Sequence, residues 1–540
     1  MRRTFLLLVG AIAAGASLTS VAQLVGAPAP PPGGLGPPVG PADGRAGVVG
    51  PAAPGAGQPK VLQPYIRMRE TLTSNANLGS GSSARSDWIT ELGAGLRINF
   101  RAPRLTAFGD IGLAQYIYAG RTQKNATTPR VTLQSVWEAV DRTLFLDTAI
   151  NSYRTFDSAF SFQPTDRALG GDNAITLSTL RVSPYLTGQL GRARYLLRDD
   201  NTWVKSSGTN NALALRDSYQ NLLTGQVAVS PTPFGWDLTY NHSETKYDSQ
   251  PALSSDITRG RAIYQANNEL QVYLTAGHES NQFYLQTVSG AVYGGGTVWR
   301  PGPRTTLNAN YEHRYFGPSH RLSFAHRMRL LSLSLNSSRD VYTIPQLAST
   351  IPVGVDLRAL LDSIFAADPR YSDPIVRAAV VDAYMLANNL PRTLTTVSYS
   401  YAPVITLRSS QSATLAAIGA QSSLAFTLYT ARSEPISSDT GSLIPVQNPL
   451  LFNRQRGASL VYNNRLTAQT RGNAALFVVN TTGLEGVGPR TRQRSLTLTL
   501  DHRYTASTNL VAGARYQRFM SVGAPDTDEY AVFAGFDHRF

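Results

Sequence analysis

The residues of this chain that could carry out a reaction are few. A serine nucleophile and a histidine base on one β-strand must share a face, which requires an even spacing. His278 and Ser280 meet this condition, whereas His320 and Ser323 do not. No Asp or Asn that would orient the histidine can be assigned from the sequence. We therefore predict that the protein is not an enzyme, with the His278 and Ser280 pair as the alternative.

Metal and cofactor sites are not indicated either. No group of His, Asp or Glu has the spacing of a metal site, and the sequence contains no Cys. The run Gly294-Gly295-Gly296 is followed by Trp299 and Pro301 and not by a helix, so it is not a phosphate-binding loop. We expect it to let a sheet bend or a side chain from an inserted segment approach. The prediction is no metal and no cofactor.

The elements that hold these residues are extended. From residue 61 to 540, segments of roughly 10 to 14 residues alternate apolar and polar side chains, which is the period of a β-strand. Trp88, Leu92 and Leu96 share one face of such a segment, and Glu91 shares the other with Arg97. We predict that the polar faces line an aqueous interior, with these candidate lumen residues: Glu91, Arg97, Asn308, Asn310, Glu312, Arg314, Asp501 and Arg503.

Aromatic residues near the segment ends separate a membrane barrel from a soluble sandwich, which also alternates. Rings of Trp and Tyr at both membrane interfaces are typical of outer-membrane barrels. The candidate interface aromatics are Trp88, Trp236, Trp299, Tyr315 and Tyr504, and His313, His502 and His538 are expected near the same levels. The predicted fold class is therefore all-β, a single large antiparallel transmembrane β-barrel over residues 61–540.

The number of strands follows from the turn signals. Tight breaks such as 101–104, 190–192 and 230–233 resemble periplasmic turns, and longer polar loops run near 119–129, 156–173 and 434–455. At roughly 20 residues per strand we predict about 22 strands, an even number between about 18 and 26. In 393–433 the sequence does not distinguish two strands from four.

The two ends of the chain indicate export. Residues 1–22 have the charged start, apolar run and small-residue site of a cleaved secretory signal peptide, and residues 23–60 form a disordered Pro/Gly/Ala-rich periplasmic leader. The last segment ends in Phe, as in barrels recognised by the barrel-assembly machinery. Its predicted insertion signal is Tyr530, Val532, Phe536, His538 and Phe540. The predicted location is the Gram-negative outer membrane.

One segment breaks the strand pattern. Residues 354–391 predict a helical hairpin in a loop, with Asp356 as an N-cap, Asp373-Pro374 starting the second helix and Pro391 beyond its end. We expect it on the extracellular side or inside the barrel as a plug. A structural cap without a gating role is an equal alternative.

The basic charge of the chain is almost entirely guanidinium. Only four of the 49 Lys and Arg residues are lysines, and the net charge is +14. The arginines are scattered singly, which favours lumen carboxylates, lipopolysaccharide phosphates and acidic glycans as partners over nucleic acid. We expect contacts with outer-membrane lipid, lipopolysaccharide and the assembly machinery, and no nucleic acid.

Scattered short motifs carry a family resemblance over most of the chain beyond the leader. They lie at 62–66, 86–91, 182–186, 290–301 and 311–317, with 388–391 ending the insert, while 74–77 departs from the pattern. The chain resembles the PEP-CTERM/exosortase system-associated outer-membrane β-barrel proteins. The resemblance implies an association with exopolysaccharide export. Two functions fit: a passive, porin-like conduit, or a non-conducting structural or assembly factor of the export machinery.

Overall fold

The computed structural model describes residues 62–156, 159–166, 168–169, 174–208, 217–248, 250–283, 286–302, 304–328, 330–342, 355–356, 393–394, 405–419, 421–438, 441–442, 452–484 and 488–540. The predicted signal peptide, the leader and residues 354 and 357–391 of the predicted insert lie outside these ranges. Residues Val355–Asp356 form a short strand, β16, paired with β17 (Thr393–Leu394). Asp356 is therefore extended, and the helix that the sequence predicted to follow it lies outside the described residues.

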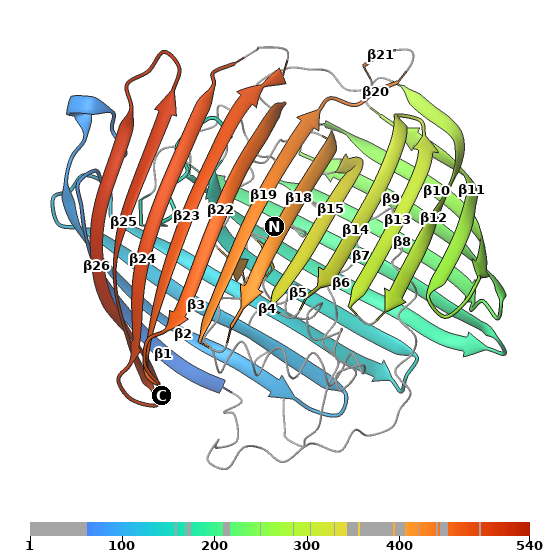
Figure 1. Ribbon diagram of the computed structural model, residues 1–540, viewed down its shortest axis with the longest axis horizontal. Helices are drawn as coiled ribbons and strands as arrows, with labels where there is room; N and C mark the ends of the chain where they lie inside the picture. Colours follow the sequence, from blue (N-terminus) through green and yellow to red (C-terminus); the bar gives the residue numbers. More distant parts are fainter. Residues whose placement is uncertain are drawn as a thin grey trace.

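A single antiparallel sheet of 22 strands closes on itself, because β1 pairs with both β2 and β26 (Figure 1). The predicted fold class and strand number are confirmed. The strands of the sheet are β1 (Leu62–Thr73), β2 (Asp87–Arg101), β3 (Leu105–Tyr118), β4 (Ala126–Val140), β5 (Leu144–Phe156), β6 (Ala174–Leu190), β7 (Ala193–Gly208), β8 (Ser218–Val229), β9 (Phe234–Tyr247), β10 (Gln250–Gln265), β11 (Leu270–Gln282), β12 (Thr287–Gly302), β13 (Thr305–Arg314), β14 (Gly317–Arg327), β15 (Leu331–Tyr342), β18 (Thr406–Ile418), β19 (Ser422–Glu434), β22 (Asn453–Arg465), β23 (Thr470–Gly483), β24 (Thr491–Arg503), β25 (Thr508–Ser521) and β26 (Thr527–Arg539).

Little else is regular in the described ranges. Strands β20 (Ser437–Ser438) and β21 (Gly441–Ser442) form a two-residue hairpin. The only helix in these ranges is a 3-10 turn, η1 (Gly81–Ser83), so none of them contains a helix able to cross a membrane. The stretch 393–433 contains β17, β18 and almost all of β19. The sequence could not settle that number.

The faces of the strands are inverted relative to a soluble protein. On β24, Leu496, Leu498 and Leu500 are 37%, 47% and 45% exposed, whereas Gln493 and Ser495 are 4% and 3% exposed. The outer surface of the barrel is therefore apolar and the inner surface polar. Exposing such a belt to water would lose about 25 cal/mol per Å² of apolar surface, so the belt must be covered by lipid.

The two ends of the barrel differ in their connections. At the end where the C-terminus lies, every connection between consecutive barrel strands has two to four residues, as at 191–192 and 230–233; we call this the short-turn end. All longer connections lie at the opposite, long-loop end, which also carries the β20–β21 hairpin (Figure 1). This asymmetry matches the short periplasmic turns and longer extracellular loops of outer-membrane barrels.

Tyrosine rings on the inner face lie against glycines of neighbouring strands. A Cβ atom added to Gly95 would be 2.5 Å from the Tyr65 hydroxyl, and one added to Gly112 would be 2.6 Å from the same oxygen. The Tyr65 hydroxyl donates to Asp110 across 2.6 Å. The same contact recurs on the inner face at Tyr273 with Gly296 and at Tyr429 with Gly457, and on the outer face at Tyr195 with Gly188. Glycine is required here because a side chain would occupy the space of the ring.

Candidate functional site

The inner face carries all eight predicted lumen residues. Glu91, Glu312 and Arg314 are buried there, and the alternation of β2, β13 and β24 places the other five on the same side. Asp501 accepts a hydrogen bond from Asn473 across 2.6 Å. Arg97 faces Asp110 at 3.9 Å. The sequence found these positions because a period of two fixes the face of each residue.

A buried ion cluster, the Asp166 cluster, joins strands from both sides of the β1–β26 closure. Arg515 on β25 contacts Glu529 on β26 and Asp166, each at 2.7 Å. Asp166 also pairs with Arg69 on β1, and Arg69 lies 3.7 Å from Glu91 on β2. Arg515, Asp166 and Glu529 are 3% exposed or less, so these charges are compensated within the protein and not by water.

Asp166 lies in the connection between β5 and β6, whose described residues contact the inner wall. Its neighbours 159–165 reach β24 and β25: the backbone N–H of Thr165 donates to Gln517 across 2.9 Å, and Phe162 stacks on Phe519. Leu169 packs into an apolar cluster with Ile89 and Tyr116. Residues 159–166 and 168–169 therefore form an inner loop that covers the wall from β24 to β3.

The charge of Asp166 is stabilised by this position. Burial alone would raise the pKa of its carboxyl group, but Arg69, Arg515 and the backbone N–H of Ala168 outweigh burial and lower the pKa below the ordinary value. Asp166 thus remains an anion at neutral pH, held between two guanidinium groups.

Two further ion networks line the wall from β5 to β15. Arg314 contacts Glu279 at 2.7 Å and Asp340 at 2.8 Å, and neighbouring Arg259 contacts Glu312 at 3.1 Å. Arg198 joins Asp147 and Asp200 at 2.8 and 2.9 Å. In both networks each guanidinium has a carboxylate partner, so these buried charges are compensated within the wall.

The wall from β22 to β1 differs at the short-turn end. At the ends of these strands nearest the short turns, the inner face carries five arginines and only two aspartates, Asp501 and Asp537. The excess is 5 − 2 = 3 positive charges. Arg67 and Arg539 share Asp537, at 3.2 and 3.3 Å. We call this set the arginine arc; its members are Arg67, Arg465, Arg471, Arg503 and Arg539.

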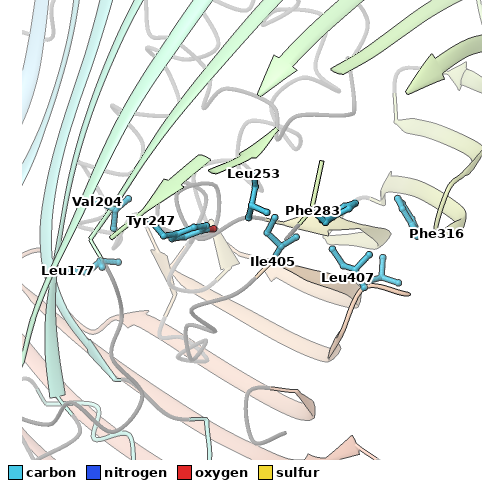
Figure 2. Close-up of a cluster of buried hydrophobic side chains, with 9 residues drawn as sticks. Leu177, Val204, Tyr247, Leu253, Phe283, Phe316, Ile405 and Leu407 are labelled. Atoms are coloured by element: carbon cyan, nitrogen blue, oxygen red, sulfur yellow. The ribbon is translucent and has the colours of Figure 1, made fainter. Parts of the chain in front are cut away.

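Apolar side chains gather at the long-loop end, and their buried cluster corrects one prediction. The cluster extends from Leu177 on β6 to Leu407 on β18, through Tyr247, Leu253, Phe283, Phe316, Ile405 and others (Figure 2). Tyr315 packs against it, 5.0 Å from the Phe316 ring. Its assignment to the lipid interface is therefore wrong. Tyr315 lies beyond the end of β13 in a two-residue turn, where strand alternation no longer fixes the direction of a side chain.

The other four interface aromatics are on the outer surface. Trp88 lies near the long-loop end and is 51% exposed. Trp236, Trp299 and Tyr504 lie near the short-turn end and are 47%, 41% and 67% exposed. On β26, Tyr530, Val532 and Phe540 of the predicted insertion signal are 59%, 56% and 53% exposed, and the alternation puts Phe536 and His538 on the same outer face.

The candidate catalytic pair is on the outer face of β11. Glu279 between them is buried, so His278 and Ser280 point away from the lumen. No hydrogen bond joins the two side chains, and the described ranges contain no group of three metal-ligating side chains. Tyr273 of the neighbouring strand β11 lies against Gly296 of the glycine run, whereas the predicted approach from the inserted segment lies outside the described residues.

Sequence reasoning missed the inner loop and most ion-pair partners. The period of two could have found the strand residues, because they occupy inner-face positions in the alternation. These residues are Arg69, Glu279, Asp340, Arg515 and Glu529. Asp166 could not be found in this way, because it lies in a connection and its partners are 97 and 349 residues away.

No protein-family model and no curated protein matches the chain. Among solved structures, the siderophore receptor PirA from Acinetobacter baumannii aligns with 8% identity over 90% of this chain and 81% of its own, at a TM-score of 0.45. OccK1 (OpdK) of Pseudomonas aeruginosa aligns with 8% identity over 89% and 99%, at 0.31. OccK2 (OpdF) of Pseudomonas aeruginosa, solved in complex with glucuronate, aligns with 7% identity over 89% of this chain and 98% of its own, at a TM-score of 0.35. At such scores these likenesses carry no functional information, and the fold rests on the strand pairing.

Proposed function

We propose that the protein is a porin-like barrel of a Gram-negative outer membrane that passively conducts hydrated, anionic solutes. The arginine arc is the observation that carries the proposal, because five guanidinium groups and only two carboxylates occupy the inner face of this wall at the short-turn end. A wall of one sign in a low-dielectric setting raises the local concentration of ions of the opposite sign. With its long loops outside the cell, as in outer-membrane barrels, the barrel places the short-turn end and the arginine arc at the periplasmic side.

The substrate class within this proposal is an acidic polysaccharide. The family resemblance in the sequence implies an exopolysaccharide system, and the arc offers guanidinium groups to carboxylates of such a chain. Neutral polysaccharide of equal length serves as the comparison in transport assays with reconstituted vesicles. Equal flux of both polymers would refute the substrate class and leave the channel proposal intact.

The channel proposal is tested in planar bilayers under a KCl gradient. Wild-type protein should give stable conductance steps, and its reversal potential should be shifted from zero toward the equilibrium potential of chloride. The triple variant Arg465→Gln, Arg471→Gln, Arg503→Gln should shift the reversal potential toward the equilibrium potential of potassium. A matched triple in the turns of the same end, Arg104→Gln, Arg142→Gln, Arg192→Gln, removes equal charge outside the lumen and should change it less. Electrically silent insertion of a folded barrel would refute conduction.

One observation favours a second function, a non-conducting structural or assembly factor. The inner loop covers the wall at β24–β3 and the buried apolar cluster covers it from β6 to β18, so both halves of the interior carry packed material at the long-loop end. Silent insertion together with cross-linking of residues 27–60 to a periplasmic export component would favour this alternative.

A further inference from the structure

An outward-facing group of arginines occupies the long-loop end of β22 and β24. On β24, Gln493 and Ser495 are buried in the inner face, so Arg492 and Arg494 point outward and are exposed. On β22, Asn453 and Gln455 are buried, which turns Arg454 and Arg456 outward. We call these four residues the outer arginine row.

The members of the row are close together. Arg456 pairs with Asn480 of β23, which pairs with Arg492, so the two arginines are two strands apart, about 10 Å. None of the four has an ion-pair partner among the described residues, unlike the flanking Arg432 and Arg518, which contact Glu434, Asp526 and Asp528. Guanidinium groups bind phosphate with two parallel hydrogen bonds, so the row is a surface for a multiply phosphorylated group.

An apolar groove begins directly below the row. Leu496 follows Arg494 on the outer face of β24, and the groove continues across β25 and β26 to β1 with a volume of about 560 Å³. It exists because Ala514 is small and lies between Leu498 and Val532 in the register. Its outer lining is Leu72, Leu496, Leu498, Ala514, Tyr516, Tyr530 and Val532.

We propose that the outer arginine row and this groove together bind one phosphorylated glycolipid of the outer leaflet, the lipid A part of lipopolysaccharide. The phosphates contact the row, and an acyl chain lies in the groove. The row is within four residues of the long-loop ends of strands that are 13 residues long, which puts it at headgroup level, since about 9 to 11 residues cross the hydrocarbon region. The proposal rests on the outer-membrane orientation proposed above.

Native mass spectrometry of the detergent-solubilised full chain with bisphosphorylated lipid A tests it. Arg454→Gln, Arg456→Gln, Arg492→Gln, Arg494→Gln should lower the affinity by about tenfold or more, because charge-assisted hydrogen bonds are lost. Dephosphorylated lipid A should bind wild-type protein as weakly as the quadruple variant binds the intact lipid. Lys205→Gln, Lys246→Gln is a control that removes two outward charges near the same end, since both lysines also point outward there but contact Asp217 and Glu244.

The groove has its own variant. Ala514→Phe fills it and should weaken lipid A binding while leaving the weak binding of inorganic pyrophosphate unchanged. Wild-type lipid A affinity in the quadruple variant, or pyrophosphate affinity equal to that of lipid A, would overturn the proposal; full affinity in Ala514→Phe would overturn the groove as the acyl site. Heat-dependent gel mobility reports folding of each variant. Bilayer conductance of the quadruple variant, expected at the wild-type value, separates a failed lipid site from a failed channel.

Discussion

Replacing Asp166 with Asn should release the inner loop from the barrel wall without opening the barrel. The substitution removes the charge that Arg69 and Arg515 share, but both arginines keep a carboxylate, Glu91 and Glu529 respectively. The strands that close the sheet, β1 and β26, lose no backbone pairing. The effect is therefore confined to the docking of the inner loop.

The size of the effect follows from the contacts. A hydrogen bond to a charged group contributes about 1.5–3 kcal/mol, and Asp166 makes one to each of two arginines. Because both arginines retain other partners, we take about 3 kcal/mol as the loss in docking free energy. At about 1.4 kcal/mol per factor of ten, the undocked population rises by about a hundredfold.

Limited chymotrypsin digestion in detergent measures this population, with Phe160 and Phe162 as the cleavage sites in the loop. Where opening and closing are fast, cleavage follows the open fraction, so the variant should be cut about a hundredfold faster. Asp526→Asn is the control. Asp526 lies in a connection at the same end and also contacts an arginine, but its side chain is 37% exposed. Cleavage of Asp166→Asn at the wild-type rate would refute the reasoning, provided that its gel mobility shows a folded barrel.

Three further predictions use the same structure. Arg314→Met leaves Glu279 and Asp340 without their shared partner and should lower the free energy of unfolding by about 3–5 kcal/mol, measured by urea unfolding in detergent, whereas Arg142→Gln at a 76% exposed position should leave it unchanged. Since the pKa of Asp166 is lowered in the folded state, its contribution to docking is complete above the ordinary carboxyl value of about 4 and is lost as the pH falls through the lower folded value. Digestion of wild type at each pH, by chymotrypsin down to about pH 5 and by pepsin in stronger acid, should show a constant open fraction from about pH 8 to 5 and a rise only below that range. A rise at about pH 6 would contradict this. Gly296→Val places a Cβ 2.4 Å from the Tyr273 hydroxyl and should cost about 1–3 kcal/mol of stability, whereas Gly290→Ala, with no atom within 4 Å, is the control; equal stability of the two variants would contradict the packing.

The barrel was predictable because lipid and water impose a strict period of two. Leu496 and Gln493 reveal their faces from sequence alone, since a slip by one residue would exchange lipid and lumen. The strand number followed from turn spacing. The same reasoning placed Glu91 and Arg314 on the inner face without naming their partners, because partners come from the register of neighbouring strands.

The remaining errors and gaps lie where this period ends. Tyr315 is in a turn and Asp166 in a connection, and the directions of both are decided by packing with residues distant in the chain.

The ring-on-glycine contacts have a consequence for assembly of the sheet. Main-chain hydrogen bonds form equally well when one hairpin slides past the next, so the ladder alone does not choose an alignment. Each tyrosine ring accepts only a neighbour without a Cβ atom, as Tyr429 does opposite Gly457. A sliding strand would present a bulkier side chain to the ring and be rejected. Four tyrosines with such contacts, spread around the circumference, thus select one strand register while the sheet assembles.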